Sequence, residues 1–129
     1  MFKLDWLHKW GSPKYFYQKT NNLAIYLGLI SLILIITGWF MGLFIAPSDY
    51  QQQDAFRIIY IHVPAAFLSV AIYSYIAFLS IVYIVWKIKV ADILANVSAH
   101  IGAGFTLLAL ITGAIWGKPM WGKIGRAHV

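Results

Sequence analysis

The chain has 129 residues, of which 61% are hydrophobic, 17% aromatic and 11% charged, and its formal net charge is +6. A soluble domain keeps about a quarter of its residues charged, so this composition excludes an ordinary water-soluble protein and indicates one that lies in lipid. The excess of cations does not predict nucleic-acid binding, because the basic residues flank apolar runs, as they do in membrane proteins.

The first 22 residues carry four lysines with aromatic residues between them. The apolar run that follows is longer and less interrupted than the core of a signal peptide. We therefore expect residues 1–22 to form an amphipathic segment at the membrane interface, with a solvated basic tail as the alternative.

Three apolar runs follow, each long enough to cross about 30 Å of hydrocarbon at about 1.5 Å per residue. They predict helices at about residues 23–46, 60–86 and 93–116, and a polar connector separates the first two. The sequence thus predicts an all-α integral membrane helix bundle with three transmembrane helices.

The third run carries small residues at steps of four and three on one helical face: Ser98, Gly102, Thr106, Ala109, Gly113 and Gly117. Such a stripe lets another helix approach closely, and we interpret it as ordinary packing within the bundle. Beyond the stripe, Pro119 argues against a continued helix.

Six lysines lie in the N-terminal segment and in the turn at Lys87 and Lys89, all on one side of the predicted bundle. The positive-inside rule places that side, with the N-terminus, in the cytoplasm. The connector before the second helix and the tryptophans after the third then meet on the outer face.

His62 lies where the connector turns into the second apolar run, two residues before Pro64, a residue that suits the first turn of a helix. An imidazole at a membrane boundary needs polar partners or a metal, and a neutral histidine is a standard axial ligand of haem iron. Trp116 and Trp121 could pack on a porphyrin face, and Arg57 could pair with a propionate. On the residues alone, a packed histidine and tryptophans that only anchor the membrane are the favoured interpretation.

The other chemistry that the sequence offers is weaker. With no cysteine, disulfides and thiolate metal sites are excluded. His8 lies in the N-terminal segment, and His100 is expected about 20 Å deeper than His62, so these two cannot clamp one haem with it. No carboxylate pair lies in an apolar span, and Asp49 and Asp54 are most simply solvated, so no catalytic residue is predicted.

Three stretches resemble one known family closely: 46–52 (APSDYQQ), 57–66 (RIIYIHVPAA) and 112–122 (TGAIWGKPMWG). The chain resembles the cytochrome c maturation protein C family, also called the haem exporter protein C family, from about residue 23 to residue 122.

The resemblance implies a haem-handling protein of the bacterial inner membrane with six helices in the parent family. It implies that haem b is held non-covalently and transiently at the outer face, through one histidine in each of two outer loops and a tryptophan-rich segment. His62 stands at the position of the first histidine, and Trp116, Gly117, Trp121 and Gly122 match the start of that segment. The implied partners are a membrane-anchored haem chaperone and the subunits of an ATP-binding-cassette transporter.

After Gly122 the chain departs from the family pattern, which continues in tryptophans and a closing aspartate. Residues 123–129 resemble a translated sequencing adapter, so we expect residues 1–122 to be the N-terminal part of a haem-handling domain and the tail, His128 included, to be non-native.

The sequence therefore predicts a binding and transfer module rather than an enzyme, which delivers haem to a chaperone during c-type cytochrome biogenesis. An electron-transfer membrane cytochrome subunit and a structural membrane subunit without a cofactor are the alternatives.

Overall fold

The protein is a set of three long antiparallel helices in the computed structural model, which describes residues 9–121, and only the backbone of Met120 and Trp121. In chain order the elements are α2 (Pro13–Phe40), which continues as the π-helical turn η1 (Met41–Ile45), the 3-10 helix η2 (Asp54–Ile58), α3 (Ile59–Trp86) and α4 (Lys89–Trp121). The three helical segments are long and apolar enough to cross a membrane. The all-α fold and its three predicted spans are thus confirmed for this part of the chain.

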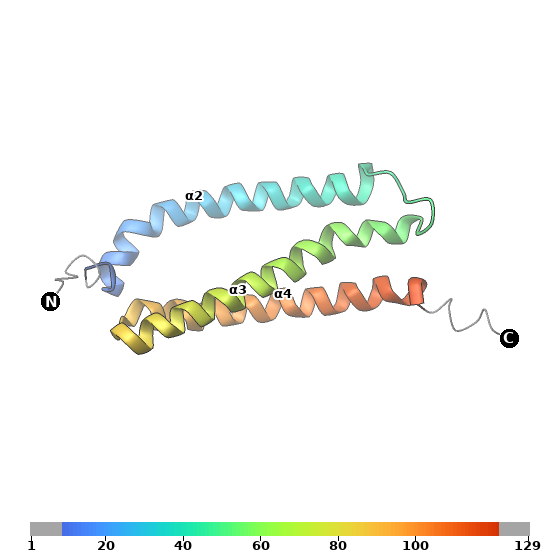
Figure 1. Ribbon diagram of the computed structural model, residues 1–129. Helices are drawn as coiled ribbons and strands as arrows, with labels where there is room; N and C mark the ends of the chain where they lie inside the picture. Colours follow the sequence, from blue (N-terminus) through green and yellow to red (C-terminus); the bar gives the residue numbers. More distant parts are fainter. Residues whose placement is uncertain (1–8, 122–129) are drawn as a thin grey trace.

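The helices are not equally close to one another. In Figure 1, α3 and α4 lie side by side along much of their lengths, whereas the middle of α2 stands apart. No side chain of α2 is buried, and a Cβ added at Gly28 would meet no described atom within 4 Å. α2 meets its neighbours near its ends, where Phe16 packs against the turn region of the pair and Gly42 of η1 lies against Tyr60. The fold is a tight helix pair with a third helix attached at both ends.

The start of α2 differs from the prediction. The helix begins at Pro13 rather than at residue 23, and the hydroxyl of Thr20 donates to the carbonyl of Phe16 within its first turns, at 2.8 Å. Proline is tolerated in a first turn because its missing N–H has no intrahelical partner there. Hydropathy marks where the chain becomes apolar and not where the helix starts.

The interfacial placement of residues 1–22 stays a prediction, and residues 1–8 lie outside the described part.

The link between α3 and α4 is tighter than predicted. α3 ends at Trp86 because Lys87 adopts the left-handed conformation (φ 55°), from which its N–H donates to the carbonyl of Tyr83 at 2.8 Å. α4 starts at Lys89 instead of residue 93, so Asp92 lies in its first turn, where a carboxylate favours the helix dipole.

The positions of Pro64 and Pro119 in their helices differ from the prediction. Pro64 lies inside α3 rather than in its first turn, because α3 already begins at Ile59. Pro119 lies inside the last turn of α4, which runs to Trp121 rather than ending at residue 116. A proline near the C-terminal end of a helix removes one hydrogen bond without blocking the turn that follows, so the predicted stop is wrong.

The small-residue stripe of α4 is the surface against which α3 packs, as predicted. A Cβ added at Gly102 would lie 3.0 Å from Ile72, and the hydroxyls of Ser69 and Thr106 form a 2.6 Å hydrogen bond across the helix pair. Close backbones and hydroxyl pairs of this kind hold helices together where water is absent. The stripe places the N-terminal part of α3, with His62, directly on α4.

Candidate functional site

His62 reaches from the second turn of α3 across to α4. Its Nδ1 lies 3.1 Å from the carbonyl oxygen of Ala109 and 3.1 Å from the hydroxyl oxygen of Thr112. The approach is possible because position 113 is glycine: a Cβ there would lie 3.0 Å from the Cε1 of His62. Among the described residues, no hydrogen bond involves the other ring nitrogen, Nε2, which leaves that atom open to a ligand.

Trp116 lies one turn further along α4 and completes the contact. The centroids of the His62 and Trp116 rings are 5.8 Å apart, with the ring planes tilted by 56°. The indole Nε1 of Trp116 donates to the side-chain oxygen of Gln52 at 3.0 Å. The connector, the start of α3 and the last turns of α4 therefore meet at one end of the bundle, as the three-span prediction required.

Gln52 is held in place by the connector itself. One carboxylate oxygen of Asp49 accepts the backbone N–H groups of Gln51 and Gln52, at 3.0 and 2.9 Å. A side chain that bonds the backbone two or three residues on is typical of an Asx turn. Asp49 therefore shapes the loop that presents Gln52, a role that the interpretation of Asp49 as merely solvated missed.

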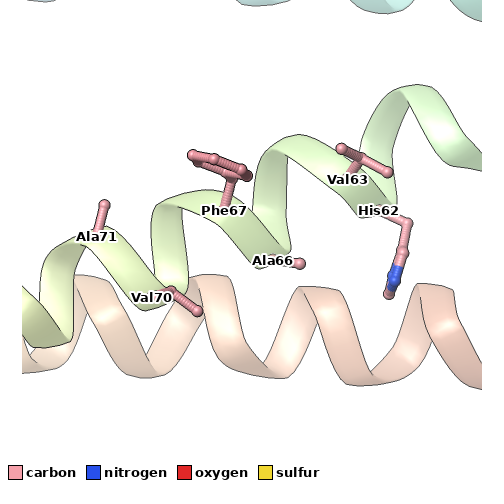
Figure 2. Close-up of a pocket in the computed structure, with 6 residues that line it drawn as sticks. All are labelled: His62, Val63, Ala66, Phe67, Val70 and Ala71. Atoms are coloured by element: carbon pink, nitrogen blue, oxygen red, sulfur yellow. The ribbon is translucent and has the colours of Figure 1, made fainter.

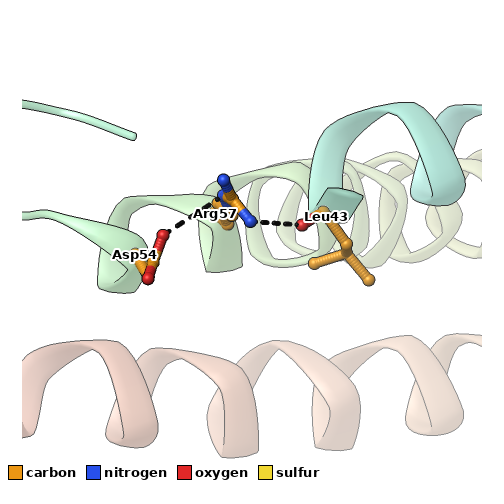
Figure 3. Close-up of polar contacts among 3 residues, drawn as sticks. All are labelled: Leu43, Asp54 and Arg57. Carbon is orange, nitrogen blue, oxygen red and sulfur yellow. Dashed lines mark hydrogen bonds and ion pairs between the residues drawn. The ribbon is translucent and has the colours of Figure 1, made fainter. Parts of the chain in front are cut away.

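Arg57 takes part in a different contact. Its Nη1 donates to the carbonyl of Leu43 in η1 at 2.9 Å, and its Nε lies 3.5 Å from a carboxylate oxygen of Asp54 (Figure 3). The Nε is buried and has no hydrogen bond of acceptable geometry. Arg57 thus fixes η2 to the end of α2, and the structure does not bring it to the pair formed by His62 and Trp116.

An apolar hollow of about 370 Å³ adjoins His62. Its lining residues all come from α3: His62, Val63, Ala66, Phe67, Val70 and Ala71. Figure 2 shows His62 directed toward α4, whereas Val63 and Phe67 point away from that helix. The open ring of His62 therefore borders apolar surface that continues along α3.

His100 does not join this site. His100 is exposed, bonds the carbonyl of Asn96 on its own helix, and lies about three turns from Thr112 along α4, in agreement with the predicted difference in depth. The side chain of Trp121 and the whole of Gly122, His8 and His128 lie outside the described part. Within that part, no group of three or more His, Cys, Asp or Glu residues could hold a metal ion.

Three contributors escaped the sequence analysis: Gln52, Thr112 and the space at Gly113. The stripe that contains Gly113 was visible in the sequence, but which α3 residue fills each gap depends on helix register. Thr112 gave no separate signal, because a threonine in an apolar helix commonly bonds its own backbone.

Comparisons with known proteins agree with one another. The family model described as "Heme exporter protein C" matches residues 6–125. The heme exporter protein C of Haemophilus influenzae is 44% identical over 117 residues, which are 91% of this chain and 48% of the relative. The heme exporter protein C of Escherichia coli is 43% identical over 116 residues, 90% of this chain and 47% of the relative. A protein of Marchantia polymorpha described as "Putative cytochrome c biosynthesis ccmC-like mitochondrial protein" is 46% identical over 83 residues, 64% of this chain and 36% of the relative. The chain spans about half the length of the bacterial relatives.

Proposed function

Because the chain belongs to the Heme exporter protein C family, we propose that it binds haem at the outer face of the inner membrane and hands it on during c-type cytochrome biogenesis. The observation that carries this proposal is the geometry of His62. Its Nδ1 is engaged by α4, and its Nε2 has no hydrogen bond among the described residues. An imidazole restrained at one nitrogen and open at the other is what axial ligation of haem iron requires.

The surroundings of His62 fit a porphyrin. Trp116 offers an indole 5.8 Å from the imidazole, and the hollow along α3 is lined by aliphatic and aromatic side chains. A macrocycle with an apolar edge can bury that edge against such surface, while its carboxylates stay toward water. The gap that Gly113 leaves beside the ring keeps the imidazole uncrowded.

In this proposal each residue has a separate task. His62 binds the iron through Nε2, Trp116 and Trp121 form the edge of the haem platform, and Arg57 pairs with a propionate. The Arg57 role stays a prediction, because in the structure its side chain contacts Leu43 and Asp54 rather than the pair formed by His62 and Trp116. Haem is cargo here, held non-covalently as haem b, and its release rather than any bond chemistry is the outcome. The protein is thus a transfer module and not an enzyme.

The proposed direction of transfer follows the charge distribution. The lysine-rich end with the α3–α4 link lies in the cytoplasm, so the end with His62 and Trp116 faces outward. A membrane-anchored haem chaperone receives the haem there, and the subunits of an ATP-binding-cassette transporter act in the same pathway. Of the alternatives, an electron-transfer cytochrome is disfavoured because His100 lies about three turns from the contact of His62 with α4.

Ligation by His62 is tested on the 129-residue chain in phospholipid nanodiscs. Ferric haem is titrated in and the Soret band is followed, with empty nanodiscs as the blank. We expect His62→Ala and His62→Gly to lose the protein-specific band, and added imidazole to restore it in the glycine variant only. His100→Ala is the matched control and should bind as the unmodified chain does. Unchanged affinity and spectrum in both His62 variants would refute the ligand assignment.

The outward orientation is tested by single cysteines, since the chain has none of its own. A membrane-impermeant maleimide applied to intact spheroplasts should label Tyr50→Cys in the connector and leave Lys87→Cys at the opposite end unlabelled. The reverse pattern would place the site on the cytoplasmic face.

A further inference from the structure

Both contacts of His62 Nδ1 are compatible with a proton on that nitrogen. The carbonyl oxygen of Ala109 can only accept, so a hydrogen bond to it at 3.1 Å places the proton on Nδ1. The hydroxyl of Thr112 donates to the carbonyl of Leu108 at 2.7 Å, which leaves its oxygen free to accept the same N–H. In the neutral ring Nε2 then carries the lone pair, and it is the nitrogen that can bind iron.

The His62 ring depends on Thr112 for a hydrogen bond, whereas Thr112 does not depend on His62. Thr112 is 9% exposed, and its hydroxyl is satisfied by the backbone of its own helix, so it needs no partner on α3. Within the part of the chain that the structure describes, the hydrogen bonds of the His62 ring, by contrast, go to the turn 109–112 of α4. Removing the Thr112 hydroxyl therefore takes a partner from His62 and costs α4 no backbone bond.

Gly113 restricts the ring from a second side. A Cβ at this position would lie 3.0 Å from Cε1 and 3.5 Å from Nδ1 of His62. Positions 109, 112 and 113 share one face of α4 because they are three and four residues apart. Ala109 and Thr112 bond the ring at Nδ1, Gly113 lies beside Cε1, and Nε2 has no hydrogen bond among the described residues.

We propose that Thr112, with the Ala109 carbonyl and the gap at Gly113, positions His62 for haem by fixing the Nδ1–H form and presenting Nε2 to the iron. Thr112 is a positioning residue and binds no iron itself. This inference rests on the proposed function, since it assigns how the ligand histidine is oriented. Partners of this kind set the ring orientation and basicity of a metal-bound histidine, and losing one typically lowers affinity about 10- to 100-fold.

The first test compares hydroxyl variants in the nanodisc titration. Thr112→Val keeps the shape of the side chain but removes the hydroxyl, and we expect it to weaken haem binding about tenfold. Thr112→Ser retains the hydroxyl and should bind within about threefold of the unmodified chain. Thr106→Val is the matched control: this hydroxyl also bonds its own helix and reaches α3, but its partner there is Ser69. Equal affinities of Thr112→Val and Thr106→Val would overturn the proposal.

A second readout needs no haem. Nitrogen-15 NMR of histidine-labelled chain at pH 8 distinguishes protonated from unprotonated ring nitrogens, and His62→Ala identifies the His62 signals among those of the four histidines. We expect Nδ1 of His62 to be protonated in the unmodified chain and in Thr112→Ser, with a shifted Nδ1 signal in Thr112→Val. Protonation at Nε2 in the unmodified chain would contradict the proposal.

The two hypotheses fail in different ways. If His62→Ala retains haem, the proposed function fails, whatever the NMR spectra show. If His62→Ala loses haem but Thr112→Val binds as tightly as Thr106→Val, only the positioning role is wrong.

Discussion

The two ends of the α3–α4 pair are held together by different chemistry. Near the link, the contact is an apolar cluster of Leu79, Ile88, Val90 and Ala91, against which Phe16 of α2 packs. At the opposite end, the helices meet through the bonds of His62 to α4 and of Trp116 to the connector. Polar side chains at membrane depth are costly and typically functional. We therefore expect the apolar end to govern stability and the polar end to govern the proposed site, so that each can be altered without the other.

The largest expected effect concerns the apolar end. Leu79→Ala removes a side chain that is only 7% exposed, and we expect it to lower the free energy of unfolding by about 2 kcal/mol, the low end for buried leucines. Leu110→Ala, at a 66% exposed position of α4, is the control and should cost much less. Unfolding in mixed micelles followed by circular dichroism measures both. A loss of haem affinity in Leu79→Ala equal to that of His62→Ala would contradict the division between the two ends.

Substituting two glycines allows the polar end to be compared with the middle of the helix pair, because an added methyl group is equally crowded at both positions. An added Cβ meets its first neighbour at 3.0 Å both at Gly113, where it touches His62, and at Gly102, where it touches Ile72. We expect Gly113→Ala to weaken haem binding about tenfold by displacing the ring, and Gly102→Ala to leave binding unchanged. Equal effects of the two variants on the Soret titration would show that helix spacing, and not the ring of His62, controls affinity.

The bond between Gln52 and Trp116 predicts a smaller change. Gln52→Leu removes the acceptor of the indole N–H, worth about 1 kcal/mol or about fivefold in haem affinity. If Gln52 acts through the indole, the same substitution should have no effect in a Trp116→Phe background, which a double-mutant cycle measures. Gln51→Leu is the neighbouring control, because its side-chain amide bonds Tyr50 instead. Additive effects of Gln52→Leu and Trp116→Phe would contradict this coupling.

The smallest effect is expected for a contact in the middle of the helix pair. Ser69→Ala breaks the hydroxyl pair with Thr106 and should lower stability by about 0.6 kcal/mol, the average for hydrogen bonds between membrane helices. Ser74→Ala is the control, since that hydroxyl is exposed and, among residues 9–121, bonds the carbonyl of Val70 on its own helix. If the free energy of unfolding of Ser69→Ala equals that of the unmodified chain within measurement error, this hydrogen bond does not stabilise the helix pair.

Hydropathy was sufficient to predict three spans, since runs of uncharged residues are long enough to cross a bilayer whatever their tertiary contacts. It missed the start of α2 at Pro13 and the continuation of α4 through Pro119, because helix ends depend on local backbone geometry rather than on polarity. His62 could be selected from the sequence because an imidazole at a membrane boundary needs polar partners or a metal. Thr112 and Gln52 did not, since their importance comes from partners that lie far away in sequence and depend on helix register.

The short link at Lys87 also bears on the order in which the protein assembles. Contacts across α3 and α4 close a small loop, so this hairpin can form as soon as its second helix has entered the membrane. The bond between Gln52 and Trp116 joins residues 64 positions apart and needs the last turns of α4. The bond from Trp116 to the connector therefore forms after the hairpin that supports it.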